Sequence, residues 1–171
     1  MRVLLQRVGV SEAWQPVEAL AAQVDARAND GIALVVDGAA QAIDFYTQVL
    51  GASERMRMGG PDGKIGHAEL EFGDSVVMLA DEYPDMGYVG PKAVGGTPVT
   101  IGVYVEDVDK TFDAAVKAGA KALRPVEDQF YGDRSGQIED PFGHRWSIST
   151  HVEDVPPDEM QKRAAAMGGG S

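Results

Sequence analysis

The chain contains an internal repeat, and this feature restricts its possible folds more than any other. One copy begins with Ile32-Ala-Leu-Val-Val and closes with Gly51-Ala52. The second begins with Ile101-Gly-Val-Tyr-Val and closes with Gly119-Ala120. The two copies keep nearly the same spacing between their parts. A chain built this way is expected to fold as two similar units that pack together.

Each copy begins with the pattern of a strand followed by a helix. The opening runs are rich in β-branched residues, which favour strands. Apolar residues then recur at helical spacing, at Ala39, Ala42, Ile43, Tyr46 and Leu50 in the first copy and at Val108, Phe112, Ala115, Val116 and Gly119 in the second. We expect Asp37 and Asp107 to cap these helices, and Gly51 and Gly119 to end them in a left-handed conformation.

Three further strands are predicted after each helix. Short runs of alternating or apolar residues, bounded by glycine, proline and aspartate turns, indicate them. They are 53–58, 65–72 and 75–80 in the first copy, and 121–126, 135–139 and 145–150 in the second. The order βαβββ therefore occurs twice, which predicts an α+β fold of paired βαβββ modules.

Composition excludes several classes of protein. The chain has 171 residues, no cysteine and a formal net charge of −12. Disulfides, thiolate nucleophiles and cysteine-bound metals are therefore excluded. The acidic surface, with no basic stripe, argues against nucleic acid and anionic membranes as partners. With no signal peptide or membrane span recognised, we expect a cytoplasmic protein.

Several ordered motifs resemble the vicinal oxygen chelate superfamily, which holds glyoxalases, bleomycin-resistance proteins and extradiol dioxygenases. The resemblance covers about residues 31–155. Three stretches are most similar to the PhnB-like branch. The motifs are Val36-Asp-Gly-Ala-Ala with Ile43-Asp-Phe-Tyr46, His67-Ala-Glu-Leu70, Arg124-Pro-Val-Glu-Asp-Gln-Phe-Tyr-Gly-Asp-Arg134, and Asp140-Pro-Phe-Gly-His-Arg-Trp146.

The resemblance implies an architecture and an oligomeric state. The paired modules, 31–81 and 99–151 with linker 82–98, would form an eight-stranded, half-open barrel-like sheet around a cavity, with helices outside. Such a domain would span 29–155, between an N-terminal extension (1–28) that can form a helix and a tail (156–171). The resemblance also implies a homodimer. The methyltransferase label common in the PhnB-like branch is set aside, because no glycine-rich loop for S-adenosylmethionine is recognised.

Metal-dependent relatives place ligands on the first and last strand of each module. Carried over, those positions hold Gly31, Met78, Thr100 and Ser147. None of these is a good ligand for a hard divalent ion. We therefore expect neither a metal nor another cofactor.

Strand alternation predicts which side chains face the cavity. Ala33, Met78, Thr100, Tyr104, Gln137 and Ser147 are the expected ligand-binding residues on that face. Tyr131 and Arg134 lie in a polar stretch that could form the cavity mouth. An internal clasp between Asp133 and Arg134 is the alternative for that stretch.

His67 and Glu69 are the candidate catalytic pair, because they lie one pleat apart on the predicted cavity face. Such a pair could move a proton or bind a metal. The alternative is a hydrogen-bonded structural histidine beside a glutamate at the rim. Trp146 is expected in the core, and His144 is expected to bond the backbone from a turn.

Two functions of different classes are open, and a third has less support. The leading interpretation is a metal-independent protein that holds a partly apolar or aromatic small molecule in its cavity. The alternative is a glyoxalase-like lyase or isomerase that uses His67 and Glu69, with or without a divalent metal. A structural or interaction module is the third, favoured only by residues 1–28.

Overall fold

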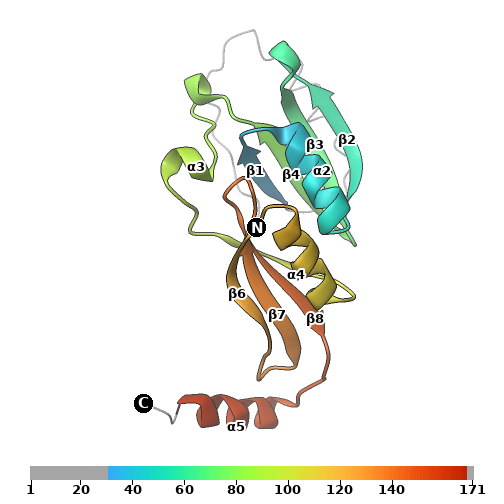
Figure 1. Ribbon diagram of the computed structural model, residues 1–171, viewed down its shortest axis with the longest axis vertical. Helices are drawn as coiled ribbons and strands as arrows, with labels where there is room; N and C mark the ends of the chain where they lie inside the picture. The colour runs from blue at the N-terminus through green and yellow to red at the C-terminus, as the bar shows by residue number, and fades with distance from the viewer. Residues whose placement is uncertain (1–30, 169–171) are drawn as a thin grey trace, which may run out of the picture. The chain divides into compact units, whose positions relative to one another are not determined.

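A computed structural model describes residues 31–168, and they contain two βαβββ modules (Figure 1). The first module comprises β1 (Ile32–Val36), α2 (Ala39–Val49), β2 (Ser53–Gly59), β3 (Ile65–Phe72) and β4 (Ser75–Asp81). Its strands pair in the order β1-β4-β3-β2. The β1–β4 pair is parallel and the other two pairs are antiparallel, so the sheet is mixed.

The second module repeats this topology. It comprises β5 (Thr100–Tyr104), α4 (Val108–Lys117), β6 (Lys121–Asp128), β7 (Asp133–Glu139) and β8 (Arg145–His151), paired in the order β5-β8-β7-β6. The α+β fold of paired βαβββ modules is therefore confirmed, with the eight strands arranged as two four-stranded sheets. The linker carries η3 (Pro84–Met86) and α3 (Pro91–Val94), η2 (Pro61–Gly63) joins β2 to β3, and α5 (Pro157–Gly168) follows β8.

One face of each sheet is covered by its own helix. Figure 1 shows α2 against the first sheet and α4 against the second, and both helices contact the strands of their module. The side chains on these covered faces are buried: Leu34, Val36, Ala68, Leu70, Val77 and Leu79 in the first module, and Ile101, Val103, Ile138, Trp146 and Ile148 in the second. The alternation predicted from the sequence is confirmed. The opposite faces are called here the outward faces.

Helix α4 begins and both helices end as predicted. The Asp107 carboxylate accepts a hydrogen bond from the Lys110 amide at 3.0 Å, which caps α4. Gly51 and Gly119 adopt left-handed φ angles of 73° and 102° after the two helices. Both positions therefore favour glycine, which adopts this conformation without steric cost.

The prediction that Asp37 caps α2 is wrong. Gly38 occupies the cap position, with a left-handed φ of 96° and no capping side chain of its own. The cap comes instead from Asp81 at the end of β4. One of its oxygens accepts from the Gly38 and Ala39 amides at 3.1 and 2.8 Å, and the other accepts from the Ile65 amide at 2.7 Å. A carboxylate from the parallel neighbour of β1 satisfies the free amides of the helix, so Asp37 is not needed.

Asp140, in the turn between β7 and β8, joins the two modules. Its buried carboxylate accepts from the Tyr46 hydroxyl of α2 at 2.7 Å and from the Trp146 indole nitrogen at 2.8 Å. Its other oxygen accepts from the Phe142 and His144 amides, both at 2.9 Å. Trp146 is buried in the core, as predicted.

His144 makes a second link between the modules. Its Nε2 lies 3.1 Å from the Val35 carbonyl oxygen of β1, which confirms the predicted bond from this turn histidine to the backbone. Within the described range, no helix is long and apolar enough to cross a membrane.

Candidate functional site

The outward face of the first sheet carries a row of apolar side chains interrupted by one carboxylate. Ala33 pairs with Met78, Met78 pairs with Glu69, and Glu69 pairs with Met56, so the row crosses all four strands. Met58, which pairs with His67, extends this surface by one pleat. The structure therefore brings Ala33 and Met78 together with the candidate catalytic pair.

His67 and Glu69 lie on the same outward face and touch. His67 Nε2 is 3.4 Å from Glu69 Oε1, and Arg55 Nη1 is 3.6 Å from the other oxygen of Glu69. The Glu69 side chain is only 14% exposed, and its carboxylate lies between the His67 ring nitrogen and the Arg55 guanidinium. This arrangement can hold or pass a proton, and it can equally fix the imidazole as a structural group.

The outward face of the second sheet carries more polar side chains than that of the first sheet. Gly102, Ser147, Gln137 and Arg124 form the row that corresponds to the Ala33 row of the first sheet. Thr100 and Tyr104 lie one pleat to either side of Gly102 on β5, and Tyr104 is 68% exposed. The predicted residues Thr100, Tyr104, Gln137 and Ser147 therefore share one face.

The residues at the expected metal positions do not fit a divalent ion. Glycine offers no side chain there, methionine offers a soft thioether, and the hydroxyls of Thr100 and Ser147 are weak neutral ligands. Among residues 31–168, no three His, Asp or Glu side chains converge closely enough to hold a metal. His67 and Glu69 alone make an incomplete ligand set.

A polar network joins the end of β5, the start of β7 and the end of β8. It was not predicted from the sequence. The Tyr104 hydroxyl donates to Asp133 Oδ2 at 2.6 Å, and His151 Nδ1 lies 2.9 Å from the other oxygen of Asp133. His151 Nε2 lies 2.9 Å from Asp154 Oδ1. The imidazole therefore stands between two carboxylates. Asp133 and His151 are cross-strand partners, and only knowledge of the strand register could have revealed this.

The network shifts the pKa values of its members. Hydrogen bonding to Asp133, and then to Asp154, raises the pKa of His151. Burial tends to raise the pKa of Asp133, but the hydrogen bonds from Tyr104 and His151 outweigh it, so that pKa is lowered. The hydrogen bond to Asp133 also raises the pKa of Tyr104. His151 is therefore favoured as a cation next to two anions.

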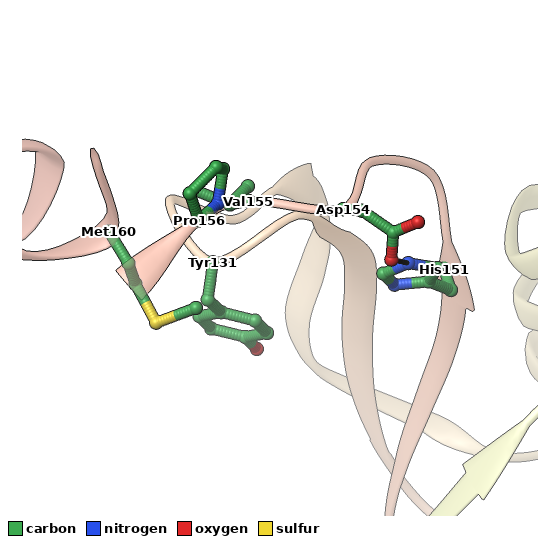
Figure 2. Close-up of a pocket in the computed structure, with 6 residues that line it drawn as sticks. All are labelled: Tyr131, His151, Asp154, Val155, Pro156 and Met160. Carbon is green, nitrogen blue, oxygen red and sulfur yellow. Dashed lines mark hydrogen bonds and ion pairs between the residues drawn. The ribbon is translucent and has the colours of Figure 1, made fainter. Parts of the chain in front are cut away.

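Tyr131 lies apart from the sheet faces, in a pocket at the C-terminal side of the second module. Figure 2 shows the six lining residues, which come from the turn before β7, the end of β8, the segment that leads into α5, and α5 itself. They are Tyr131, His151, Asp154, Val155, Pro156 and Met160, around a volume of about 320 Å³. Tyr131 is thus near a cavity, although not the one between sheets that the sequence suggested.

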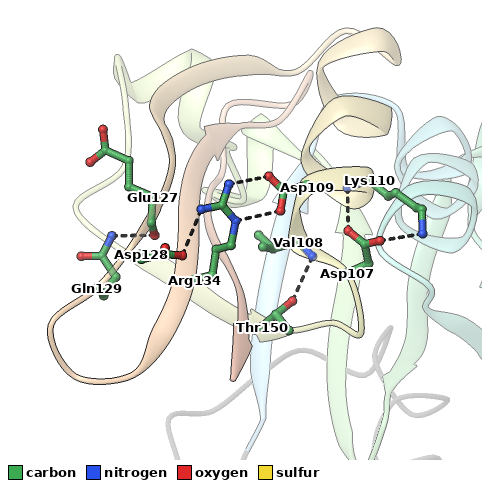
Figure 3. Close-up of polar contacts among 9 residues, drawn as sticks. All are labelled: Asp107, Val108, Asp109, Lys110, Glu127, Asp128, Gln129, Arg134 and Thr150. Atoms are coloured by element: carbon green, nitrogen blue, oxygen red, sulfur yellow. Dashed lines mark hydrogen bonds and ion pairs between the residues drawn. The ribbon is translucent and has the colours of Figure 1, made fainter. Parts of the chain in front are cut away.

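Arg134 is engaged by carboxylates of its own chain. Figure 3 shows its guanidinium between Asp109 of α4, bonded through two nitrogens at 2.8 Å each, and Asp128 of β6 at 3.0 Å. These bonds, first those to Asp109, raise the pKa of Arg134. The alternative of a clasp with Asp133 is wrong, because both oxygens of Asp133 bind Tyr104 and His151.

Comparison with known proteins identifies the family. A sequence profile of the Glyoxalase/Bleomycin resistance protein/Dioxygenase superfamily matches residues 30–148. The chain is 47% identical over 140 residues to the uncharacterized protein Mb0911c of Mycobacterium bovis, a match that covers 80% of this chain and 92% of that protein.

Solved structures show the same architecture. TioX from Micromonospora sp. ML1 is similar with a TM-score of 0.56 and 29% identity, over 71% of this chain and 97% of TioX. A PhnB protein from Bacillus cereus is similar in fold, with a TM-score of 0.56 and 18% identity over 70% of this chain and 97% of that protein. The chain belongs to the glyoxalase/bleomycin resistance/dioxygenase superfamily.

Proposed function

We propose that this protein binds a small, partly apolar or aromatic molecule on the outward faces of its sheets, without a metal. The observation that carries this proposal is the set of residues at the positions where metal-dependent relatives hold their ion. Gly31, Met78, Thr100 and Ser147 cannot form a ligand shell for a hard cation. To sequester a small molecule, the protein needs a surface complementary to it but no catalytic groups.

The two outward faces suit such a ligand. The row of Ala33, Met78 and Met56 offers an adaptable apolar surface, since methionine side chains repack easily. The row of Ser147 and Gln137 beside Gly102 offers hydrogen-bonding groups next to a position with no side chain. Ligand sites commonly combine a large apolar area with a few placed polar groups.

We also propose that the protein acts as a homodimer and belongs to the PhnB-like branch. Exposed apolar side chains occur at one edge of each sheet, at Ile32 of β1 and at Val99 just before β5. Uncovered strand edges and apolar groups favour association with a second chain. The formal net charge of −12 disfavours nucleic acid and anionic lipid as partners. The structural similarity to the Bacillus cereus PhnB protein supports the branch.

Calorimetric titration with Zn²⁺, Ni²⁺, Mn²⁺ and Mg²⁺ tests metal independence. We expect no stoichiometric heat for any of the four ions at micromolar protein concentration. Stoichiometric binding with a submicromolar dissociation constant would overturn the proposal. Repeating a positive titration with His67→Ala would show whether the outward face of the first sheet holds the ion.

The second candidate is a glyoxalase-like lyase or isomerase, favoured by the 3.4 Å contact between His67 and Glu69. Glu69 would act as the general base, which must lie within hydrogen-bond reach of a substrate proton. Turnover can be assayed with a 2-oxoaldehyde and a thiol. Glu69→Gln should abolish it while leaving the fold intact, and Glu71→Gln, one pleat along β3 and more exposed, is the matched control. An unchanged rate in Glu69→Gln would exclude this candidate.

A further inference from the structure

The segment after β8 lies against the turn that precedes β7, and together they form a pocket that is largely open to solvent (Figure 2). The Gly132 carbonyl oxygen accepts hydrogen bonds from the Val152 and Glu153 amides at 3.0 and 2.9 Å, which ties the segment to this turn. The pocket between them has a volume of about 320 Å³, enough for a group of one or two rings. None of its residues belongs to the rows of side chains on the outward faces.

The walls of this pocket are mostly apolar and include an aromatic ring. Tyr131, Val155, Pro156 and Met160 make up the apolar part. Figure 2 shows Tyr131 and Met160 among these lining side chains. An aromatic face attracts cations as well as apolar groups, and a thioether adapts to the shape of its neighbour.

The polar part of the pocket is negatively charged. Asp154 has a fully exposed side chain, and its hydrogen-bond partner in the structure is His151. Because His151 is shared with Asp133, one imidazolium faces two carboxylates and the cluster keeps an excess of negative charge. Nearby Glu153, by contrast, is held by two nitrogens of Arg163 at 2.8 Å.

We propose that this pocket binds an organic cation, with its apolar or aromatic group against Tyr131 and Met160 and its ammonium group against Asp154. This site adjoins the outward face of the second sheet, to which His151 is linked through Asp133 and Tyr104, but it does not depend on the function proposed for that face. A neutral compound of the same shape would gain only the apolar contact. An anion would be repelled by Asp154.

Proton binding at His151 competes with such a ligand. A neutral imidazole can donate from only one nitrogen, so the loss of its proton frees one of the two carboxylates. Asp133 of β7 also accepts from Tyr104 of β5, so Asp154 of the tail is the carboxylate more readily released. The other polar side chain that lines the pocket is that of Tyr131. Affinity for the cation should therefore rise as the pH increases through the titration of His151.

The experiment is an NMR titration of the full chain with benzyltrimethylammonium, monitored at the amides of the Tyr131 turn and of 151–160. We expect saturable shifts there with a dissociation constant on the order of 1–10 mM. Benzyl alcohol should bind more weakly, and phenylacetate should not bind at these amides. Equal affinity for all three compounds, or no saturation by the cation, would overturn the proposal.

Two variants distinguish the contribution of charge to the affinity for the cation from the contribution of packing. Asp154→Asn should weaken binding of the cation about 3- to 5-fold, the scale of one exposed charge pair. Asp158→Asn is the matched control, because it removes one exposed acid of the same tail that does not line the pocket. Tyr131→Leu should weaken the cation more than benzyl alcohol. Equal weakening by both Asp variants would refute a specific site.

Discussion

Tyr46→Phe should destabilise the protein far more than the loss of a hydroxyl at the surface. The hydroxyl of Tyr46 on α2 donates a hydrogen bond to the Asp140 carboxylate at 2.7 Å, and the Tyr46 side chain is fully buried. Burial, followed by the charge of Asp140, raises the pKa of Tyr46 well above its ordinary value. The phenol therefore stays protonated, and remains a donor, at neutral pH.

The magnitude follows from the number of donors around the carboxylate. A buried hydrogen bond to a charged group contributes about 1.5–3 kcal/mol. Trp146 and two backbone amides still donate to Asp140 in the variant, so the buried carboxylate keeps three hydrogen bonds. We expect a loss of about 2 kcal/mol, or about 4–8 °C in Tm for a chain of this size. Asp140→Ala should cost about 3–5 kcal/mol, since it leaves four buried donors without this acceptor.

Urea unfolding followed by circular dichroism measures these losses. Tyr88→Phe is the control, because Tyr88 is 54% exposed and the same hydroxyl is removed. Surface substitutions of this kind usually change stability by less than about 0.5 kcal/mol. If Tyr46→Phe matched Tyr88→Phe, the account of Asp140 as the link between the modules would be wrong.

Three further outcomes are expected. Asp81→Ala should lose about 2–4 kcal/mol in urea unfolding, because three backbone amides lose their acceptor, whereas Asp37→Ala should be nearly neutral. The pKa of His151, measured by NMR, should lie above its ordinary value and fall in Asp133→Asn. Because this pKa is raised, the stabilisation from His151 is fully present below about pH 6.5 and is lost as the pH rises through the folded-state pKa. Gly136→Ala should cost about 1–3 kcal/mol, since its Cβ would lie 2.9 Å from the Phe112 ring, and an unchanged urea midpoint would contradict that packing.

Most of the strands and helices could be predicted because the repeat supplies every element twice. Alternation of apolar side chains identifies the covered face of each strand, and this depends only on local geometry. Leu70 and Ile138, for example, are both completely buried on the third strand of their modules. The same alternation placed His67 and Glu69 on one face without any knowledge of the fold.

The contacts that the sequence did not reveal join residues far apart in the chain. Asp81 caps a helix that starts 42 residues earlier, which requires the parallel pairing of β1 with β4. Asp133 meets His151 only through the register of β7 and β8. Arg134 was expected at a cavity mouth, yet Asp109 reaches it from α4. Local periodicity carries no information on these side-chain pairings.

The most direct test of the central claim is the metal content of the purified protein. The chain is incubated with an equimolar mixture of divalent ions, desalted, and analysed by inductively coupled plasma mass spectrometry. Metal-independent binding predicts far less than one ion per chain, equal in the wild type and in a His67→Ala, Glu69→Gln double variant. One ion per chain, or per pair of chains, that is lost in this double variant would contradict the claim.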